Sequence, residues 1–221
     1  MRIDRKQNMN GRKKYLLITM LLEWITLIVQ LYLHLKNSPA GPAESLIRFF
    51  SFFTILTNLL VAVYLTVLWS SLATAQPKSI ETGFWFRPSV QTAIALYILI
   101  VGLIFNLILR SLWDYSDDLQ TVVNELLHTV IPLLVLIYWW IWVDGRRLRY
   151  ADIPAWLIYP AVYACYILIR GHFAAWYPYP FMDVVKNGYS KVLINSSMMV
   201  GVFVLFALLF VFFGKRKRSY A

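Results

Sequence analysis

The sequence predicts an all-α fold: a polytopic membrane protein in which six transmembrane helices form one bundle with both termini in the cytoplasm. Of the 221 residues, 60% are hydrophobic and only 14% are charged. The apolar residues come in blocks of about 18 to 25, long enough to cross a hydrocarbon core about 30 Å thick. Each block must be a helix, because lipid offers the backbone no hydrogen-bond partners. The predicted spans cover about 15–35, 46–69, 89–110, 121–143, 153–169 and 192–213.

The positions of the basic residues predict the orientation. An even number of spans puts both termini on one side, and 15 of the 21 Lys and Arg residues fall on that side. By the positive-inside rule the tails, 1–14 and 214–221, are cytoplasmic. The connection 111–120 holds Asp114, Asp117 and Asp118 without a basic residue, which agrees with an outer position. We therefore expect one transmembrane domain, 15–213, between two basic cytoplasmic tails.

Each predicted span has a distinct set of polar residues or flanking connections. The first contains Glu23 and Gln30, which distinguish it from a cleaved signal peptide. The second carries a polar run at 54–58, the third ends in polar residues, the fourth contains a histidine, and the fifth and sixth follow short connections. The connection 70–88 ends in the aromatic run 84–86, typical of an interfacial anchor.

The last connection, 171–190, is aromatic and interrupted by proline. It reads Tyr177-Pro178-Tyr179-Pro180-Phe181-Met182-Asp183. Proline stiffens the backbone, and aromatic rings favour the membrane interface or a lid over a cavity. Tyr179 and Asp183 are therefore candidate substrate-binding residues.

Polar side chains gather at one depth in the outer half of the predicted bundle. At about 1.5 Å per residue, Thr54 lies roughly 12 Å below the outer end of its span and His128 roughly 10 Å below its own. An intramembrane histidine is costly, so a function is the default hypothesis for it. Pro132 frees the carbonyl of His128 and is expected to bend the helix there. The same layer contains Asn58, Asn106, Arg110, Asn124, Glu125, Arg170 and Asn195. We expect a polar pocket that opens outward or sideways into the outer leaflet.

Simpler interpretations stay open for each of these residues. Thr54 can bond to the carbonyl one turn earlier, and Thr57 and Asn58 can hold helices together. His128 can be a core histidine bonded to the backbone. Glu125 either lies at the interface or orients a base in the pocket.

These motifs resemble a bacterial six-span integral membrane family. That family is related to the eukaryotic androgen-induced gene proteins and to the androgen-dependent regulator of tissue factor pathway inhibitor. The resemblance rests on the run 52–58, on 106–110, on His128 followed by Pro132, and on Arg170 leading to 177–183. It implies an intramembrane threonine hydrolase of fatty acid esters of hydroxy fatty acids. The implied nucleophile is Thr54, with Ser51 and Thr57 as alternatives one turn away, and the implied base is His128.

The leading hypothesis is therefore a lipid-ester hydrolase in a multi-pass membrane protein, in the bacterial cytoplasmic membrane. In this chemistry a threonine needs a neighbouring imidazole to take its proton, and the developing oxyanion needs hydrogen-bond donors, for which Asn58, Asn106, Asn195 and Arg170 are candidates by depth. The alternative is a transporter or binding protein for a lipid or small molecule, and a third possibility is a structural membrane protein.

The expected partners are a fatty acid ester and membrane lipids. The net charge of +10 lies mostly beside the spans, where it fixes topology and meets lipid headgroups, so no nucleic-acid binding is expected. No cofactor or metal is expected, because the chain has one cysteine and three histidines without metal-ligand spacing.

Overall fold

The computed structural model describes residues 2–74, 83–112 and 118–217. Within these ranges all regular secondary structure is helical, and six helical segments are long and apolar enough to cross a membrane. These segments are Met9–Asn37, Phe53–Thr74, Pro88–Leu112, Asp118–Trp142, Tyr150–Ala174 and Val184–Arg216. The predicted all-α, six-helix membrane fold is confirmed. Asp114 and Asp117, used above to argue the orientation, lie outside the described residues, and the cytoplasmic position of the termini stays a prediction.

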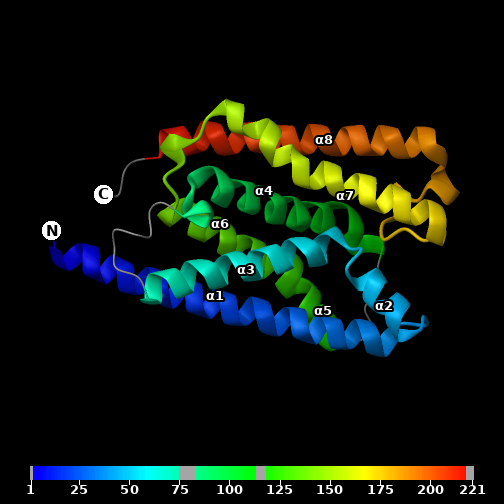
Figure 1. Cartoon of the computed structure of the whole chain (residues 1–221), viewed down its shortest axis with the longest axis horizontal. Helices are drawn as coiled ribbons and strands as arrows, with labels where there is room; N and C mark the ends of the chain where they lie inside the picture. The colour runs from blue at the N-terminus through cyan, green and yellow to red at the C-terminus, as the bar shows by residue number, and fades with distance from the viewer. Residues whose placement is uncertain (1, 75–82, 113–117, 218–221) are drawn as a thin grey trace.

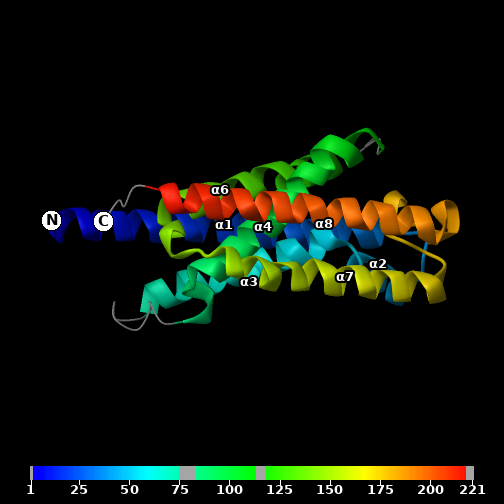
Figure 2. The same cartoon turned by 90° about the horizontal axis from the view of Figure 1, so that it is seen from above.

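The helices form one elongated bundle. Helices α1 (Arg2–Asn37) and α8 (Val184–Arg216) lie along opposite edges in Figure 1, and the start of α1 and the end of α8 lie at the same end of the bundle. Helix α7 (Ile153–Ala174) runs beside α8, as both views show (Figures 1 and 2). Helix α1 is longer than its predicted span, since it begins at Arg2 and includes residues assigned to the basic tail.

Helix α4 (Pro88–Ile104) lies at the centre. It packs against α3 (Phe53–Thr74), α6 (Ile131–Trp142) and α8. Every residue of α4 from Ala93 to Ile98 is buried, which explains why this span is apolar on all sides rather than on one stripe. Many large apolar side chains on the other helices are exposed, as expected for surfaces that face lipid.

The predicted second span is not one continuous helix. It consists of α2 (Pro42–Phe49) and α3, separated by residues 50–52. At this break Ser51 Oγ donates to the Ile47 carbonyl at 2.6 Å, and the Ser51 carbonyl accepts from Tyr163 Oη at 2.9 Å. Two backbone carbonyls at the break thus accept hydrogen bonds from side-chain hydroxyls. The depth of Thr54 was counted along a continuous helix, whereas Thr54 lies in the first turn of α3, so that depth stays a prediction.

Two helices contain π-helical turns. One, η2 (Phe105–Leu109), follows α4 and leads into η3 (Arg110–Leu112). The other, η4 (Leu126–Val130), joins α5 (Asp118–Glu125) to α6. Pro132 has no N–H to give to the His128 carbonyl, which accounts for the irregular turn at the predicted place. Such turns often occur at functional sites.

The connection after α7 folds back over the bundle. Helix α7 ends at Ala174 and is capped by Ala175, whose φ of 48° is left-handed, and a short turn, η7 (Pro180–Met182), precedes α8. The Tyr177 ring lies against Gly171, where a Cβ would fall 2.0 Å from the ring. Near the opposite end of the bundle are three short turns: η1 (Phe84–Phe86), η5 (Gly145–Arg147) and η6 (Tyr150–Asp152).

Candidate functional site

A cavity of about 280 Å³ lies between α1, α3, α5 and η4, toward the end of the bundle away from the termini. Four of the candidate residues, Thr54, Asn124, His128 and Tyr179, contribute to its wall. The remaining lining residues are Gln30, His34, Phe49, Phe52, Ile55, Leu109, Gln120 and Leu127. We call this space the polar cavity.

His128 is held firmly in the wall of the polar cavity. Its side chain is buried, with only 8% of the residue exposed, and its ring stacks on Phe105 at 3.8 Å between centroids. The Nδ1 atom lies 2.9 Å from the Asn124 carbonyl oxygen. Because a carbonyl only accepts, Nδ1 carries the proton, and in the neutral imidazole Nε2 is then the basic nitrogen.

The backbone of His128 is held from α4. Pro132 leaves the His128 carbonyl without its helical donor, and Asn106 Nδ2 donates to that carbonyl at 3.2 Å. Gly102 makes this close approach possible, since a Cβ there would lie 2.8 Å from the same oxygen. Asn106 is therefore committed to positioning His128.

Arg110 and Glu125 complete the support behind His128. Arg110 Nη2 lies 2.9 Å from Glu125 Oε2 and 2.6 Å from Asn106 Oδ1. Thr129 Oγ1 donates to the same Glu125 oxygen at 3.0 Å. These contacts tie η2 to the turn that carries His128, so Arg110 and Glu125 act on its position and do not line the cavity.

Thr54 is the hydroxyl that reaches the polar cavity. Its backbone N–H donates to Tyr179 Oη at 3.3 Å, and its Oγ1 lies 3.5 Å from the same oxygen. Burial raises the pKa of the Tyr179 phenol, which keeps it neutral. Within the described residues, no direct hydrogen bond joins Thr54 to His128, although both line the polar cavity.

The two alternative hydroxyls are engaged elsewhere. Besides its bond to Ile47, Ser51 lies 3.3 Å from Tyr166 Oη, and Thr57 Oγ1 lies 3.1 Å from Tyr159 Oη. Both are fully buried, and neither contributes to the polar cavity. Of the three, the geometry favours Thr54.

Asn124 supplies a free donor to the site. Its Oδ1 accepts from Gln120 Nε2 at 3.3 Å, whereas its Nδ2 is buried with no hydrogen-bond partner in the described part of the chain. A buried amide without a partner is costly, which indicates that a ligand atom could accept from it. Asn58 differs, because its Nδ2 donates to the Thr54 carbonyl at 2.8 Å and so braces the first turn of α3.

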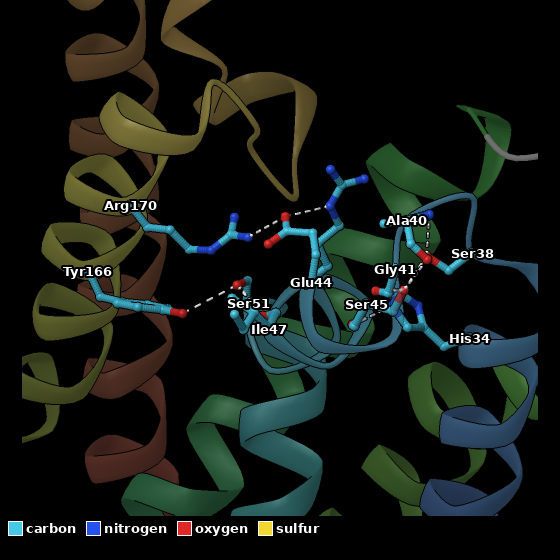
Figure 3. Close-up of polar contacts among 11 residues, drawn as sticks. His34, Ser38, Ala40, Gly41, Glu44, Ser45, Ile47, Ser51, Tyr166 and Arg170 are labelled. Carbon is cyan, nitrogen blue, oxygen red and sulfur yellow. Dashed lines mark hydrogen bonds and ion pairs between the residues drawn. The ribbon is translucent and has the colours of Figure 1, made fainter.

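Three further candidates lie away from the polar cavity. Arg170 Nη2 donates to Glu44 Oε1 at 2.9 Å, and Figure 3 shows the arginine reaching from α7 to α2. Asp183 caps α8 by accepting from the Lys186 backbone N–H at 3.1 Å. Asn195 Nδ2 donates to the Phe181 carbonyl at 2.9 Å and so holds the aromatic loop to α8.

Thr54 also borders a second, apolar cavity of about 270 Å³ between α4, α7 and α8. Its wall includes Phe53, Met199 and Phe203, together with Asn195. Thr54, Leu109 and Tyr179 belong to both walls. The Thr54 side chain thus lies at the junction of the apolar cavity and the polar cavity.

We did not predict from the sequence that Gln30 and His34 on α1, or Gln120 on α5, belong to the site. Gln30 and His34 line the polar cavity, and Gln120 Nε2 donates to Gln30 Oε1 at 2.9 Å. His34 Nε2 in turn lies 3.0 Å from the Ser45 carbonyl oxygen, in the network drawn in Figure 3. The four-residue spacing of Gln30 and His34 on one helix face was the signal that could have placed them there.

Comparison of the chain with protein-family models, with curated proteins and with solved structures found no match in any of the three. The family resemblance inferred from the sequence motifs therefore stays a prediction.

Proposed function

We propose that this protein is an intramembrane hydrolase of lipid esters, of the kind that act on fatty acid esters of hydroxy fatty acids, in the bacterial cytoplasmic membrane. The observation that carries the proposal is that Thr54 and His128 line one cavity of about 280 Å³. The motifs that resemble threonine hydrolases select the same two residues.

In the proposed reaction, Thr54 Oγ1 attacks the ester carbonyl carbon while His128 Nε2 accepts the hydroxyl proton. Asn124 Nδ2 donates to the developing oxyanion. The bond between the carbonyl carbon and the alcohol oxygen then breaks, and the alcohol leaves with the proton from His128. Water then attacks the acyl-threonine and gives a proton to His128. The bond between the acyl carbon and Thr54 Oγ1 breaks, His128 returns the proton to Oγ1, and the fatty acid is released.

The two cavities support a substrate whose ester joins an apolar acyl chain to a more polar part of the molecule. The apolar cavity fits an acyl chain, and the polar cavity fits the more polar part of the molecule beside Gln30 and Gln120. Tyr179, which borders both, would contact the ester at their junction.

The test is fatty acid release from a branched fatty acid ester by the purified protein in detergent. We expect turnover by the wild type and its loss in Thr54→Ala and His128→Ala. Thr57→Ala is the matched control, because it removes the same hydroxyl outside the polar cavity. Absence of turnover in every protein, or equal turnover in wild type and Thr54→Ala, would contradict the proposal.

One observation favours a second candidate, a transporter or binding protein. Glu23 on α1 is fully buried, and both carboxyl oxygens have no hydrogen-bond partner among the described residues. Intramembrane carboxyl groups are typical of ion and proton pathways. Glu23→Gln separates the candidates, because a hydrolase would keep turnover whereas a proton-coupled transporter would lose uptake into vesicles.

A further inference from the structure

The structure contains a third cavity, of about 400 Å³, at the end of the bundle where α1 begins and α8 ends. It is far along the bundle from the polar cavity and shares no residue with it. Its wall is formed by the end of α6, the turn η5 and the end of α8. The lining residues are Trp140, Ile141, Trp142, Val143, Asp144, Gly145, Arg146, Phe213, Arg216 and Lys217.

A contact between two glycines builds this cavity. A Cβ on Gly145 would fall 2.6 Å from the Gly214 Cα, so the backbones of η5 and α8 touch directly. A Cβ on Gly214 would lie 2.9 Å from a methyl group of Leu148, which closes the other side. Side chains from the turn and from the helix end are thereby fixed around one space.

The cavity is rich in positive charge. Arg146 pairs with Asp144 at 2.9 Å, and among the described residues Asp144 is the only acidic residue in the wall. Arg216 and Lys217 make no ion pair with any residue that the structure describes; the Arg216 guanidinium lies over the Phe212 ring, 3.4 Å from its centroid. Lys217 Nζ donates to the Trp139 carbonyl at 2.7 Å, which holds the ammonium in place without neutralising it.

The rim of the cavity is apolar and aromatic. Trp140 is 56% exposed and Phe213 is 48% exposed, and both line the cavity with the cationic groups. Exposed tryptophan next to arginine and lysine is typical of the level of lipid headgroups. A ligand that combines an anionic group with long apolar chains would satisfy both parts of this surface.

From this charge complementarity we infer that the cavity binds the headgroup of an anionic phospholipid. The phosphate oxygens accept from Arg216 and Lys217, and the acyl chains run along Trp140 and Phe213. Basic pockets between transmembrane helices recognise anionic headgroups in this way. The inference is independent of the proposed hydrolase.

The experiment measures lipid binding to the purified full-length protein in detergent by native mass spectrometry, with phosphatidylglycerol and phosphatidylcholine carrying the same acyl chains. We expect the anionic lipid to bind more tightly. Arg216→Gln should weaken that binding about five-fold, the value of one basic residue at a membrane surface. The Arg216 guanidinium lies over the Phe212 ring and makes no side-chain hydrogen bond or ion pair with a described residue, so this change should not disturb folding.

Lys215→Gln is the matched control, since Lys215 is adjacent, carries the same charge and lies over Tyr150 outside the cavity. The Lys215→Gln variant should bind the anionic lipid as tightly as the wild type does. Equal weakening in Arg216→Gln and Lys215→Gln would overturn the inference in favour of diffuse charge attraction. Equal binding of the two lipids would also overturn the inference. Displacement of the lipid by inorganic phosphate at equal concentration would overturn it too, because it would indicate a simple anion site.

Discussion

Replacing Gly102 with alanine tests how the turn that carries His128 is held. The new Cβ would lie 2.8 Å from the His128 carbonyl oxygen and 3.3 Å from Pro132 Cβ. Both neighbours belong to a rigid part of the chain, so the helices must separate by roughly half an ångström to regain ordinary contact. The bond from Asn106 to the same carbonyl, now 3.2 Å, would lengthen toward its limit.

We expect Gly102→Ala to lower the free energy of unfolding by about 1–3 kcal/mol, the usual cost of overpacking a filled interior. The assay is unfolding of the purified protein by a denaturing detergent, followed by circular dichroism. Gly201→Ala on α8 is the matched control, because nothing lies within 4 Å of the corresponding Cβ. It should be neutral or slightly stabilising. Equal stability of the two variants would refute the close approach of α4 to His128.

Three further predictions follow from contacts at other places. Tyr179→Phe removes the acceptor of the Thr54 N–H but keeps the ring. We expect ester turnover, measured by kinetics, to be roughly ten-fold slower. The melting temperature, measured by thermal denaturation, should be unchanged. Hydrogen bonding from Arg48 lowers the pKa of Glu44 from its ordinary value of 4.5, so its link to Arg170 should stabilise the fold at neutral pH. This stabilisation should be lost as the pH falls below 4.5 and through the lowered pKa, and Glu44→Gln should abolish that acid dependence of the melting temperature.

Burial lowers the pKa of Lys217 to about 8 despite the nearby Asp144. Its charge is therefore present below pH 8 and lost above it. Anionic lipid binding should weaken between pH 7 and pH 9, and Lys217→Arg should remove this dependence when the titration is repeated.

The sequence was sufficient for the number and approximate position of the spans, because hydrophobic length is dictated by the bilayer and does not depend on tertiary contacts. It also predicted an irregular helix at His128, since the effect of Pro132 on the preceding turn is local. The break before Thr54 was not predictable in this way. It depends on Tyr163, which is distant in sequence and reaches the Ser51 carbonyl only in the folded bundle.

The sequence predicted which residue types make up the candidate site, but only some of the contacts that these residues make. Counting depth along helices placed Asn106, Asn124 and Arg170 in one layer, but depth does not tell which face a side chain occupies. In the structure Asn106 supports the His128 backbone, Asn124 faces the polar cavity, and Arg170 pairs with Glu44. Such choices depend on helix rotation and packing, which only the assembled bundle determines.

The most direct test of the proposed function is a search for the acyl intermediate. The purified protein would be quenched in acid during turnover of a fatty acid ester, digested, and its peptides analysed by mass spectrometry. We predict an acyl group on Thr54 that is absent in Thr54→Ala and in unreacted protein. Turnover with the acyl group on Ser51 or Thr57, or with no acylated peptide at all, would contradict it.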